Sequence, residues 1–312
     1  MAVLLGITVV SLVSEGVIRL KNLSMGNYDV EMWRYARELK TRSANPVLGH
    51  EHISSSQAML QLVPIRINEW GLRGAPVVPR SQGGRRILIL GSSITFGWGV
   101  EEEKTLSVLL SERFRADGQE NVEVLNAGIG NYNTERYVER YLTKLVDLKP
   151  TDIIVHYFVN DAEKLESGSG NVLLENSQLA LTLWIAINRF IYSGDDESLV
   201  EHYRSVYQED QSGYRAMVAS LEKLAAHAKK DGIRLYLAMI PDVHNLTDYP
   251  FEFIHERMRK LVTRTGMRYI DLKSSFANLS PEDVWAMPGD PHPNALGHKL
   301  MADQIYPVLN TP

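Results

Sequence analysis

Short apolar runs alternate with helix-like segments from residue 86 to the end of the chain, and this alternation constrains the fold more than any other feature. Five runs have the length of strands, at residues 86–90, 122–126, 152–158, 233–240 and 267–272. Apolar residues at helical spacing fill the intervals between them, and glycine or proline ends several of these intervals. This order predicts a three-layer α/β/α sandwich around a mostly parallel five-stranded sheet.

Two regions depart from this rhythm. Residues 1–84 have weak periodicity and end in the proline- and glycine-rich stretch "GLRGAPVVPRSQGG", which indicates an N-terminal extension and linker ahead of one domain over residues 85–312. Residues 162–211 form an insertion after the third strand, with the apolar segment "LALTLWIAINRFIY". This segment fits a lid, a membrane-facing helix or a core helix. The core interpretation is favoured because a helix that is apolar on most sides is usually buried.

Composition excludes several classes of function. The 312 residues are 44% hydrophobic, so the chain can bury a sizeable core. Its formal net charge is −5 and its basic residues are scattered, so nucleic acid is not an expected partner. The absence of cysteine excludes disulfides, thiolate metal sites and cysteine nucleophiles.

The N-terminal apolar run bears on where the protein acts. It extends from Ala2 to Val13, shorter than the roughly 20 residues that span a bilayer, and no basic segment precedes it. Two accounts fit this run. Either the recorded start lies inside a longer membrane anchor, which would place the chain in the cell envelope, or the run is an ordinary helix packed on the domain.

Polar residues follow the first three strands, at the sheet edge where parallel strands place their carboxyl ends. Ser93 follows the first strand, "NAGIGNYNT" (126–134) the second, and "VND" with Asn160 the third. A serine, free backbone N–H groups and an amide together supply a nucleophile and an oxyanion hole for acyl chemistry. The alternative interpretations are a helix cap for Ser93 and a turn residue for Asn160.

A candidate base lies near the C-terminus, in "GDPHPNALGH". Pro291 and Pro293 favour extended geometry at the residues before them, and residues two apart in an extended segment lie on the same side. Asp290 is therefore expected to orient His292, whose other ring nitrogen faces the serine as general base.

These four blocks, in this order, resemble the SGNH or GDSL-type esterase and acetylhydrolase superfamily. The resemblance implies that Ser93 is the nucleophile, that Asp290 and His292 complete a triad, and that the Ser93 and Gly130 N–H groups with the Asn160 amide form the oxyanion hole. It implies no metal and no organic cofactor.

Three departures from the family pattern qualify this resemblance. Ser92 replaces the usual aspartate, and Phe158 stands where block three usually has glycine. The block-two glycine sits one place early, so the backbone donor is Gly130 or Asn131, with Gly130 favoured. Only one residue separates Asp290 from His292, a spacing similar to that of the alginate-type polysaccharide O-acetyltransferases.

The sequence therefore predicts a serine esterase acting on O-acyl esters, chiefly O-acetyl, of a small molecule or of a cell-envelope or exported polysaccharide. The alternatives are an O-acetyltransferase with the same triad and a non-catalytic carbohydrate-binding module. Membrane association through the N-terminus is a further expectation.

Other residues are weaker candidates. Asn131, Arg73 and His244 are candidates for substrate contact, and a structural salt bridge is the alternative for Arg73. His50 and His52 have a spacing seen in some metal sites, but a solvated or substrate-side loop is favoured because no further ligand cluster accompanies them.

Overall fold

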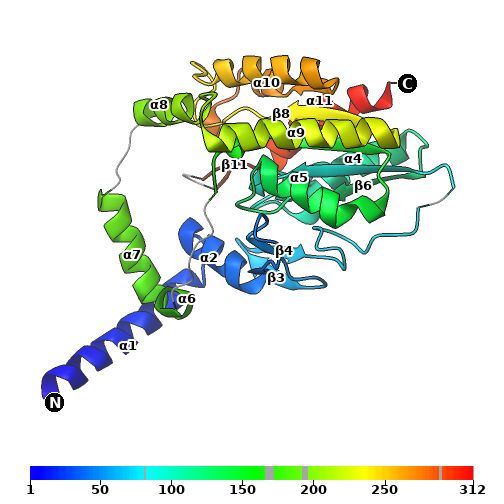
Figure 1. Ribbon diagram of the computed structural model, residues 1–312. Helices are drawn as coiled ribbons and strands as arrows, with labels where there is room; N and C mark the ends of the chain where they lie inside the picture. Colours follow the sequence, from blue (N-terminus) through cyan, green and yellow to red (C-terminus); the bar gives the residue numbers. More distant parts are fainter. Residues whose placement is uncertain (81, 166–171, 192–195, 288–289, 312) are drawn as a thin grey trace.

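The central sheet is all-parallel. The computed structural model describes residues 1–312 except 81, 166–171, 192–195, 288–289 and 312. Five strands pair in the order β6-β5-β7-β8-β9 (Figure 1). Their bounds are β5 (Arg85–Gly91), β6 (Val122–Asn126), β7 (Asp152–Tyr157), β8 (Arg234–Met239) and β9 (Arg268–Asp271). All five predicted strands are confirmed.

Alternating side chains bury both faces of the sheet. In β5, Leu88 and Leu90 face one apolar cluster while Ile87 and Ile89 face the other, since successive residues of a strand point to opposite sides. The first cluster is covered by α5 (Thr134–Thr143), α9 (Ser212–Asp231) and α10 (Glu252–Thr265). The second is covered by α4 (Leu106–Ala116) and α11 (Ala295–Asn310). The predicted three-layer sandwich is therefore confirmed.

Residues 28–74, called here the N-terminal region, pack against the loop that follows β5. They form α2 (Tyr28–Glu38) and two hairpins, β1 (Lys40–Arg42) with β2 (His50–His52) and β3 (Gln57–Leu60) with β4 (Val63–Arg66). Tyr35 and Ile65 are buried in one cluster with Phe96 and Trp98. The N-terminal region thus shares a core with the sheet domain, which its interpretation as an extension and linker does not anticipate.

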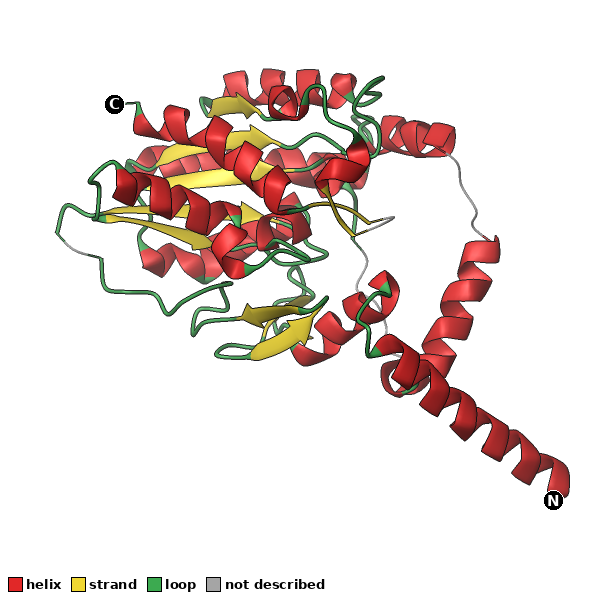
Figure 2. Cartoon of the chain, turned by 180° about the vertical axis from the view of Figure 1, so that it is seen from behind, coloured by secondary structure: helices red, strands yellow, loops and turns green. Residues whose placement is uncertain are grey.

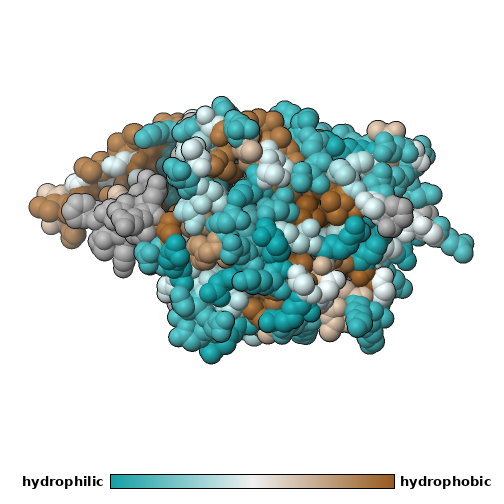
Figure 3. Space-filling model, turned by 90° about the horizontal axis from the view of Figure 1, so that it is seen from above, coloured by the Kyte–Doolittle hydropathy of each residue, from teal (hydrophilic) through white to brown (hydrophobic). Residues whose placement is uncertain are grey.

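Helix α1 (Ala2–Asn22) points away from the rest of the molecule (Figure 1). Its most apolar stretch has a mean hydropathy of 1.9, is 0% buried, and is long and apolar enough to cross a membrane. Figure 3 shows its apolar surface as the brown arm on the left. The account of this run as a helix packed on the domain is wrong, because its leucines and valines face outward rather than into a core.

The insertion contributes α6 (Val172–Asn176), α7 (Gln178–Ile191) and α8 (Asp196–Val206). The first turn of α7 contacts α1, and the rest of α7 extends away from the sheet (Figure 2). The Glu15 carboxylate of α1 accepts hydrogen bonds from the Gln178 and Leu179 N–H groups at 3.0 and 2.8 Å. Leu183, Trp184 and Ile187 are each more than half exposed. The favoured interpretation of this segment as a core helix is therefore wrong.

Candidate active site

Ser93 begins a short helix directly after β5, the second strand in the order of the sheet. Strand β5 ends at Gly91, Ser92 is the N-cap residue, and α3 spans Ser93–Phe96. A Cβ at Gly91 would lie 2.0 Å from Thr95 Oγ1 and 2.8 Å from the His156 carbonyl oxygen, so only glycine fits this turn. The tight turn leaves Ser93 partly exposed at the strand end while Ser92 stays buried.

His292 reaches the hydroxyl of Ser93 from the far end of the chain. It lies on β11 (Asp290–Pro293), which pairs antiparallel with β10 (Trp285–Met287). The distance from His292 Nε2 to Ser93 Oγ is 2.8 Å. This is hydrogen-bond distance, and it is the geometry that a general base needs to take the serine proton.

Asp290 lies two residues before His292 on the same strand, opposite Met287 in the hairpin register. Its side chain falls outside the part of the structure that is described. Its role in orienting His292 therefore stays a prediction.

The loop after β6 is locked against α3 by Asn126 and Gly128. The Asn126 side chain donates to the Thr95 carbonyl at 2.8 Å and accepts from the Gly128 N–H at 3.0 Å. A Cβ at Gly128 would lie 2.2 Å from the Phe96 nitrogen, a backbone atom that cannot move aside. Two of the sheet-edge segments are thereby held in direct contact.

Gly130, the favoured backbone donor, is engaged by the N-terminal region. Its N–H donates to the Tyr35 hydroxyl oxygen at 3.0 Å. Its carbonyl accepts from Lys40 Nζ at 2.7 Å and from His50 Nε2 at 3.0 Å. The Gly130 N–H thus has a buried partner within the protein, and which backbone N–H completes the oxyanion hole stays a prediction. Asn131, the alternative donor, has the left-handed backbone that a glycine would adopt, with φ of 62°.

A chain of hydrogen bonds continues from Gly130 into the N-terminal region. The Tyr35 hydroxyl lies 2.7 Å from His52 Nε2, and His52 Nδ1 lies 2.9 Å from the Gly71 carbonyl oxygen. With the proton on Nδ1, His52 donates to Gly71 and accepts from Tyr35, so every group in the chain is satisfied. Burial lowers the pKa of His52 well below its usual range, which keeps the ring neutral as this arrangement requires.

Lys40 and His50 are also perturbed by burial. Burial, with the Arg136 charge, lowers the pKa of Lys40 to about 7. Burial and then the Lys40 charge lower the pKa of His50 to about 3. His50 and His52 are therefore packed, neutral residues of strand β2, so the expectation of a solvated loop is wrong, whereas a position on the substrate side stays a prediction. No cluster of three or more metal-ligating side chains occurs in the described part of the chain.

Asn160 lies in the turn that follows β7, within a short 3₁₀ helix at Val159–Ala162. The buried carboxylate of Asp161 holds this turn by accepting the Phe158 N–H at 3.1 Å and the Tyr137 hydroxyl at 3.3 Å. The Asn160 Oδ1 atom is buried and has no hydrogen-bond partner among the described residues. Because an amide oxygen only accepts hydrogen bonds, this atom does not identify an oxyanion donor, and the role of the Asn160 side-chain N–H in an oxyanion hole stays a prediction.

Arg73 does not face a substrate. It is 4% exposed, and its guanidinium donates to the carbonyl oxygens of Phe96, Gly97 and Val100. Burial lowers its pKa to about 10. Both expectations for Arg73, substrate contact and a structural salt bridge, are therefore corrected: it satisfies the carbonyls at the end of α3.

His244 lies in the loop after β8, near the hairpin that carries His292. Its Nδ1 atom lies 2.8 Å from the Asp242 carboxylate, and the ring is partly exposed. The Trp285 indole of β10 donates to the Val243 carbonyl at 2.9 Å, which ties the loop to the hairpin. Substrate contact by His244 stays a prediction.

Sequence reasoning missed the contribution of α2 to the site. The rings of Tyr28 and His292 have centroids 6.0 Å apart, and Tyr35 holds Gly130 from the same helix. No local spacing signals these contacts, since Tyr35 and Gly130 are 95 residues apart in sequence. The only sequence signal is that α2 is rich in aromatic residues, which indicates a helix that packs against another part of the protein.

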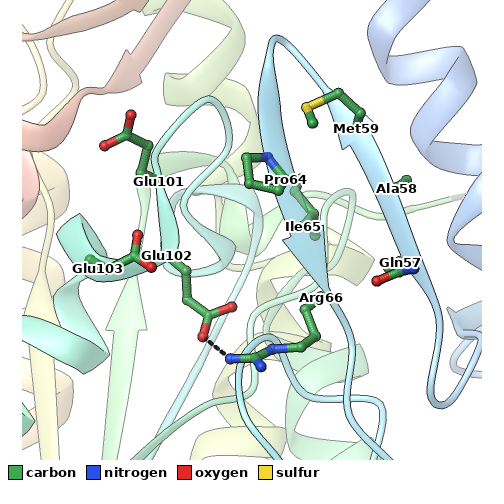
Figure 4. A pocket seen from close by; sticks show the side chains of 9 residues that line it. All are labelled: Gln57, Ala58, Met59, Pro64, Ile65, Arg66, Glu101, Glu102 and Glu103. Carbon is green, nitrogen blue, oxygen red and sulfur yellow. Dashed lines mark hydrogen bonds and ion pairs between the residues drawn. The ribbon is translucent and has the colours of Figure 1, made fainter.

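A cavity of about 810 Å³ lies elsewhere, between the β3–β4 hairpin and residues 101–103 (Figure 4). The Arg66 guanidinium pairs with the Glu102 carboxylate within it. None of the predicted site residues is among the described residues that line it, so it is separate from the candidate active site.

The parallel sheet, with a serine and a histidine in hydrogen-bond contact at its edge, defines an α/β fold of the acylhydrolase class. A family model described as GDSL-like lipase/acylhydrolase matches residues 89–300. The chain belongs to this family. A comparison with curated protein sequences gives no match.

Solved structures with similarity to this chain have low sequence identity to it. A variant of an acetyl-xylooligosaccharide esterase from Geobacillus Stearmophilus is 14% identical, with a TM-score of 0.50 over 75% of this chain and 98% of that one. An α/β hydrolase enzyme from the metagenome of Lake Arreo, Spain, is 17% identical, with a TM-score of 0.49 over 73% and 97%. The acetyl xylan esterase AlAXEase is 16% identical, with a TM-score of 0.45 over 72% and 99%.

Proposed function

We propose that this protein is a serine esterase that cleaves acetyl esters of a cell-envelope or exported polysaccharide. The observation that carries the proposal is the 2.8 Å contact between His292 Nε2 and Ser93 Oγ, made by residues from opposite ends of the domain. Membership of a lipase and acylhydrolase family supports it.

In the proposed reaction, Ser93 Oγ attacks the ester carbonyl carbon while its proton passes to His292 Nε2. The tetrahedral intermediate collapses, the C–O bond to the sugar breaks, and His292 returns the proton to the leaving alcohol. Water then attacks the acetyl-enzyme with His292 again as base, which releases acetate and restores the serine. Asp290 orients His292 in this proposal.

Three donors stabilise the oxyanion in the proposed mechanism: the N–H groups of Ser93 and Asn131 and the side-chain amide of Asn160. Asn131 replaces Gly130 because the Gly130 N–H is bound to Tyr35. Loss of one such donor costs about 10²-fold in kcat or more. We therefore expect this reduction for Asn160→Ala in the rate of small-ester hydrolysis.

The test of the proposal is hydrolysis of p-nitrophenyl acetate by the full chain. Ser93→Ala and His292→Ala should each lower kcat/KM by about 10⁴-fold or more. Ser92→Ala is the matched control, since Ser92 is a buried neighbour with no role in the proposed chemistry. Activity that survives in both site variants would rule out the assignment. A wild-type protein that hydrolyses no small ester would favour a non-catalytic carbohydrate-binding module.

A second candidate function is transfer of the acetyl group to a sugar hydroxyl. The single residue between Asp290 and His292 is the observation that favours it, because this spacing is similar to that of alginate-type O-acetyltransferases. Mass spectrometry of an oligosaccharide incubated with the enzyme and p-nitrophenyl acetate separates the two functions. Acetylated oligosaccharide would establish transfer, and free acetate alone would leave hydrolysis.

Membrane association through α1 completes the proposal. The helix is long, apolar and exposed, and Arg19 and Lys21 lie in its last turn, where basic residues suit the membrane surface. Fractionation of expressing cells tests this part. Recovery of the full chain in the soluble fraction alone would contradict it.

A further inference from the structure

A cavity of about 660 Å³ lies between α7, β10 and the turn that joins α1 to α2. Tyr28 and Met287 line it, and both are close to the catalytic histidine. The ring of Tyr28 is 6.0 Å from that of His292, and Met287 pairs with Asp290 in the β10–β11 hairpin. The cavity therefore adjoins the candidate active site.

Its walls are fixed from several sides. Glu15 binds the first N–H groups of α7, and the Asn22 side chain donates to Gln178 Oε1 at 2.8 Å, so α1 and α7 are joined where the cavity begins. The Asn27 side chain accepts the Val30 N–H at 3.3 Å and caps α2, which sets Tyr28 at the first helical position. These contacts make the cavity part of the fold.

The lining indicates the chemistry of an occupant. Polar side chains from the end of α1, the α1–α2 turn, α2 and α7 supply ammonium, amide, hydroxyl and carboxylate groups: Lys21, Asn22, Ser24, Asn27, Asp29 and Thr182. A long acyl chain requires a predominantly apolar wall, and a polyanion requires an excess of positive charge. Lys21 and Asp29 carry opposite charges, so neither ligand fits well.

The remaining lining is apolar, from the Tyr28 ring, Ile185, Ala186 and Met287. A sugar ring presents hydroxyl groups at its edge and C–H groups on its faces, which suits a wall of this mixed character. The volume lies within the range of small-molecule sites, about 300–1,000 Å³.

We propose that this cavity binds the uncharged sugar rings that flank the acetylated position of the substrate. This inference rests on the proposed esterase function and adds a glycan subsite built by α1, α2 and α7. Because α1 ends at this cavity, a membrane-inserted α1 would hold the subsite near the bilayer surface.

The test uses one variant that fills the cavity and one matched control on the same helix. Ala186→Trp adds a large ring at an exposed position that lines the cavity, whereas Ile187→Trp adds one at a neighbouring exposed position that is not among the described lining residues. For each full-length protein, kcat/KM is measured on p-nitrophenyl acetate and on partially O-acetylated xylo-, manno- and cello-oligosaccharides. The readout is the ratio of the best oligosaccharide value to the p-nitrophenyl acetate value.

We expect Ala186→Trp to lower this ratio by about tenfold or more, chiefly through KM, and Ile187→Trp to leave it near the wild-type value. Equal ratios in wild type and Ala186→Trp would overturn the subsite. So would a wild type that hydrolyses p-nitrophenyl acetate but none of the oligosaccharides. A wild type with no activity on any ester would instead contradict the proposed function itself.

Circular dichroism melting confirms that each variant is folded. If Ala186→Trp does not fold, Ala186→Leu fills the cavity less severely and replaces it. The same fall in the ratio is expected, and an unchanged ratio in Ala186→Leu would likewise overturn the subsite.

Discussion

The sheet-edge loops, at residues 91–93, 126–134 and 159–161, differ from the N-terminal region in how they contribute to the site. The loops carry the groups proposed to touch substrate, and they hold one another through backbone approaches such as Gly128 against Phe96. The N-terminal region carries no proposed nucleophile or base, yet Tyr35 binds the Gly130 N–H, and Lys40 and His50 bind the Gly130 carbonyl. The proposed catalytic groups and the residues that hold their loops in place thus come from different parts of the chain.

The largest effect is expected where the loops touch each other. Gly128→Ala would place a methyl group 2.2 Å from the Phe96 nitrogen, so the loop and α3 must separate. We expect a loss of about 3 kcal/mol or more in the free energy of unfolding, together with loss of esterase activity. Urea denaturation measures the first quantity. Gly16→Ala is the control, because its new methyl group meets nothing within 4 Å; equal stability in the two variants would contradict the close approach.

Tyr35→Phe tests the N-terminal region directly. It removes the hydroxyl between Gly130 and His52, which leaves a buried N–H and a ring nitrogen without partners. We expect a cost of about 1–3 kcal/mol in stability, and a fall in kcat as the Gly130 peptide loses its hold. Tyr236→Phe is the comparison, because this tyrosine on β8 is buried and its hydroxyl has no hydrogen-bond partner among the described residues. An increase in kcat for Tyr35→Phe would return the oxyanion role to the Gly130 N–H, because that group would then be released.

Lys40 is expected to make the stability of the N-terminal region depend on pH. Its pKa is lowered to about 7 in the folded protein and is near 10.4 in an unfolded chain. Between these values the unfolded state binds the extra proton, so the unfolding free energy contributed by Lys40 rises with pH, by at most about 1.4 kcal/mol per unit.

Lys40→Met removes this contribution. Denaturation at pH 7 and pH 9 should therefore show wild type gaining stability relative to Lys40→Met as pH rises. An unchanged difference between the two proteins would show that Lys40 is not buried against Gly130. Lys229→Met, at an exposed position on α9, is the control.

The smallest effect is expected at the joint between α1 and α7. The Glu15 carboxylate of α1 accepts hydrogen bonds from the Ser177 hydroxyl and from the Gln178 and Leu179 N–H groups at 2.9, 3.0 and 2.8 Å, and so caps the first turn of α7. Glu15→Ala removes this cap, at a cost of about 1 kcal/mol to α7, and should accelerate amide hydrogen exchange in the first turns of that helix. Thr8→Ala, elsewhere on α1, is the control. Unchanged exchange in Glu15→Ala would show that the two helices are not coupled.

The sequence predicts the sheet because its signals are local. Continuous apolar runs such as 86–90 produce strands whose two faces are both covered, and the intervals with helical spacing supply the covering helices. Ser93 and His292 are predictable for a related reason: each lies in a segment whose turn residues, Gly91 and the prolines around His292, constrain the backbone within a few positions.

The N-terminal region is not predictable in this way, because its stability comes from contacts distant in sequence. Tyr35 binds the Gly130 N–H, and Arg73 binds carbonyl oxygens at the end of α3. No spacing in the sequence predicts either contact. The prediction that α7 is a core helix fails for a similar reason. Its apolar composition is compatible with burial or exposure, and its position beside α1 decides between them.

The hydrogen bonds that link Gly130 through Tyr35 and His52 to Gly71 also set the smallest piece of chain able to work. A fragment starting at residue 85 would contain the whole matched family segment, with its nucleophile and its histidine. Without the N-terminal region, Phe96 and Trp98 would nevertheless be exposed to solvent, and the Gly130 N–H would lose its hydrogen bond to Tyr35. A functional fragment must therefore begin upstream of α2, well before residue 85, where the catalytic motifs alone would place the domain boundary.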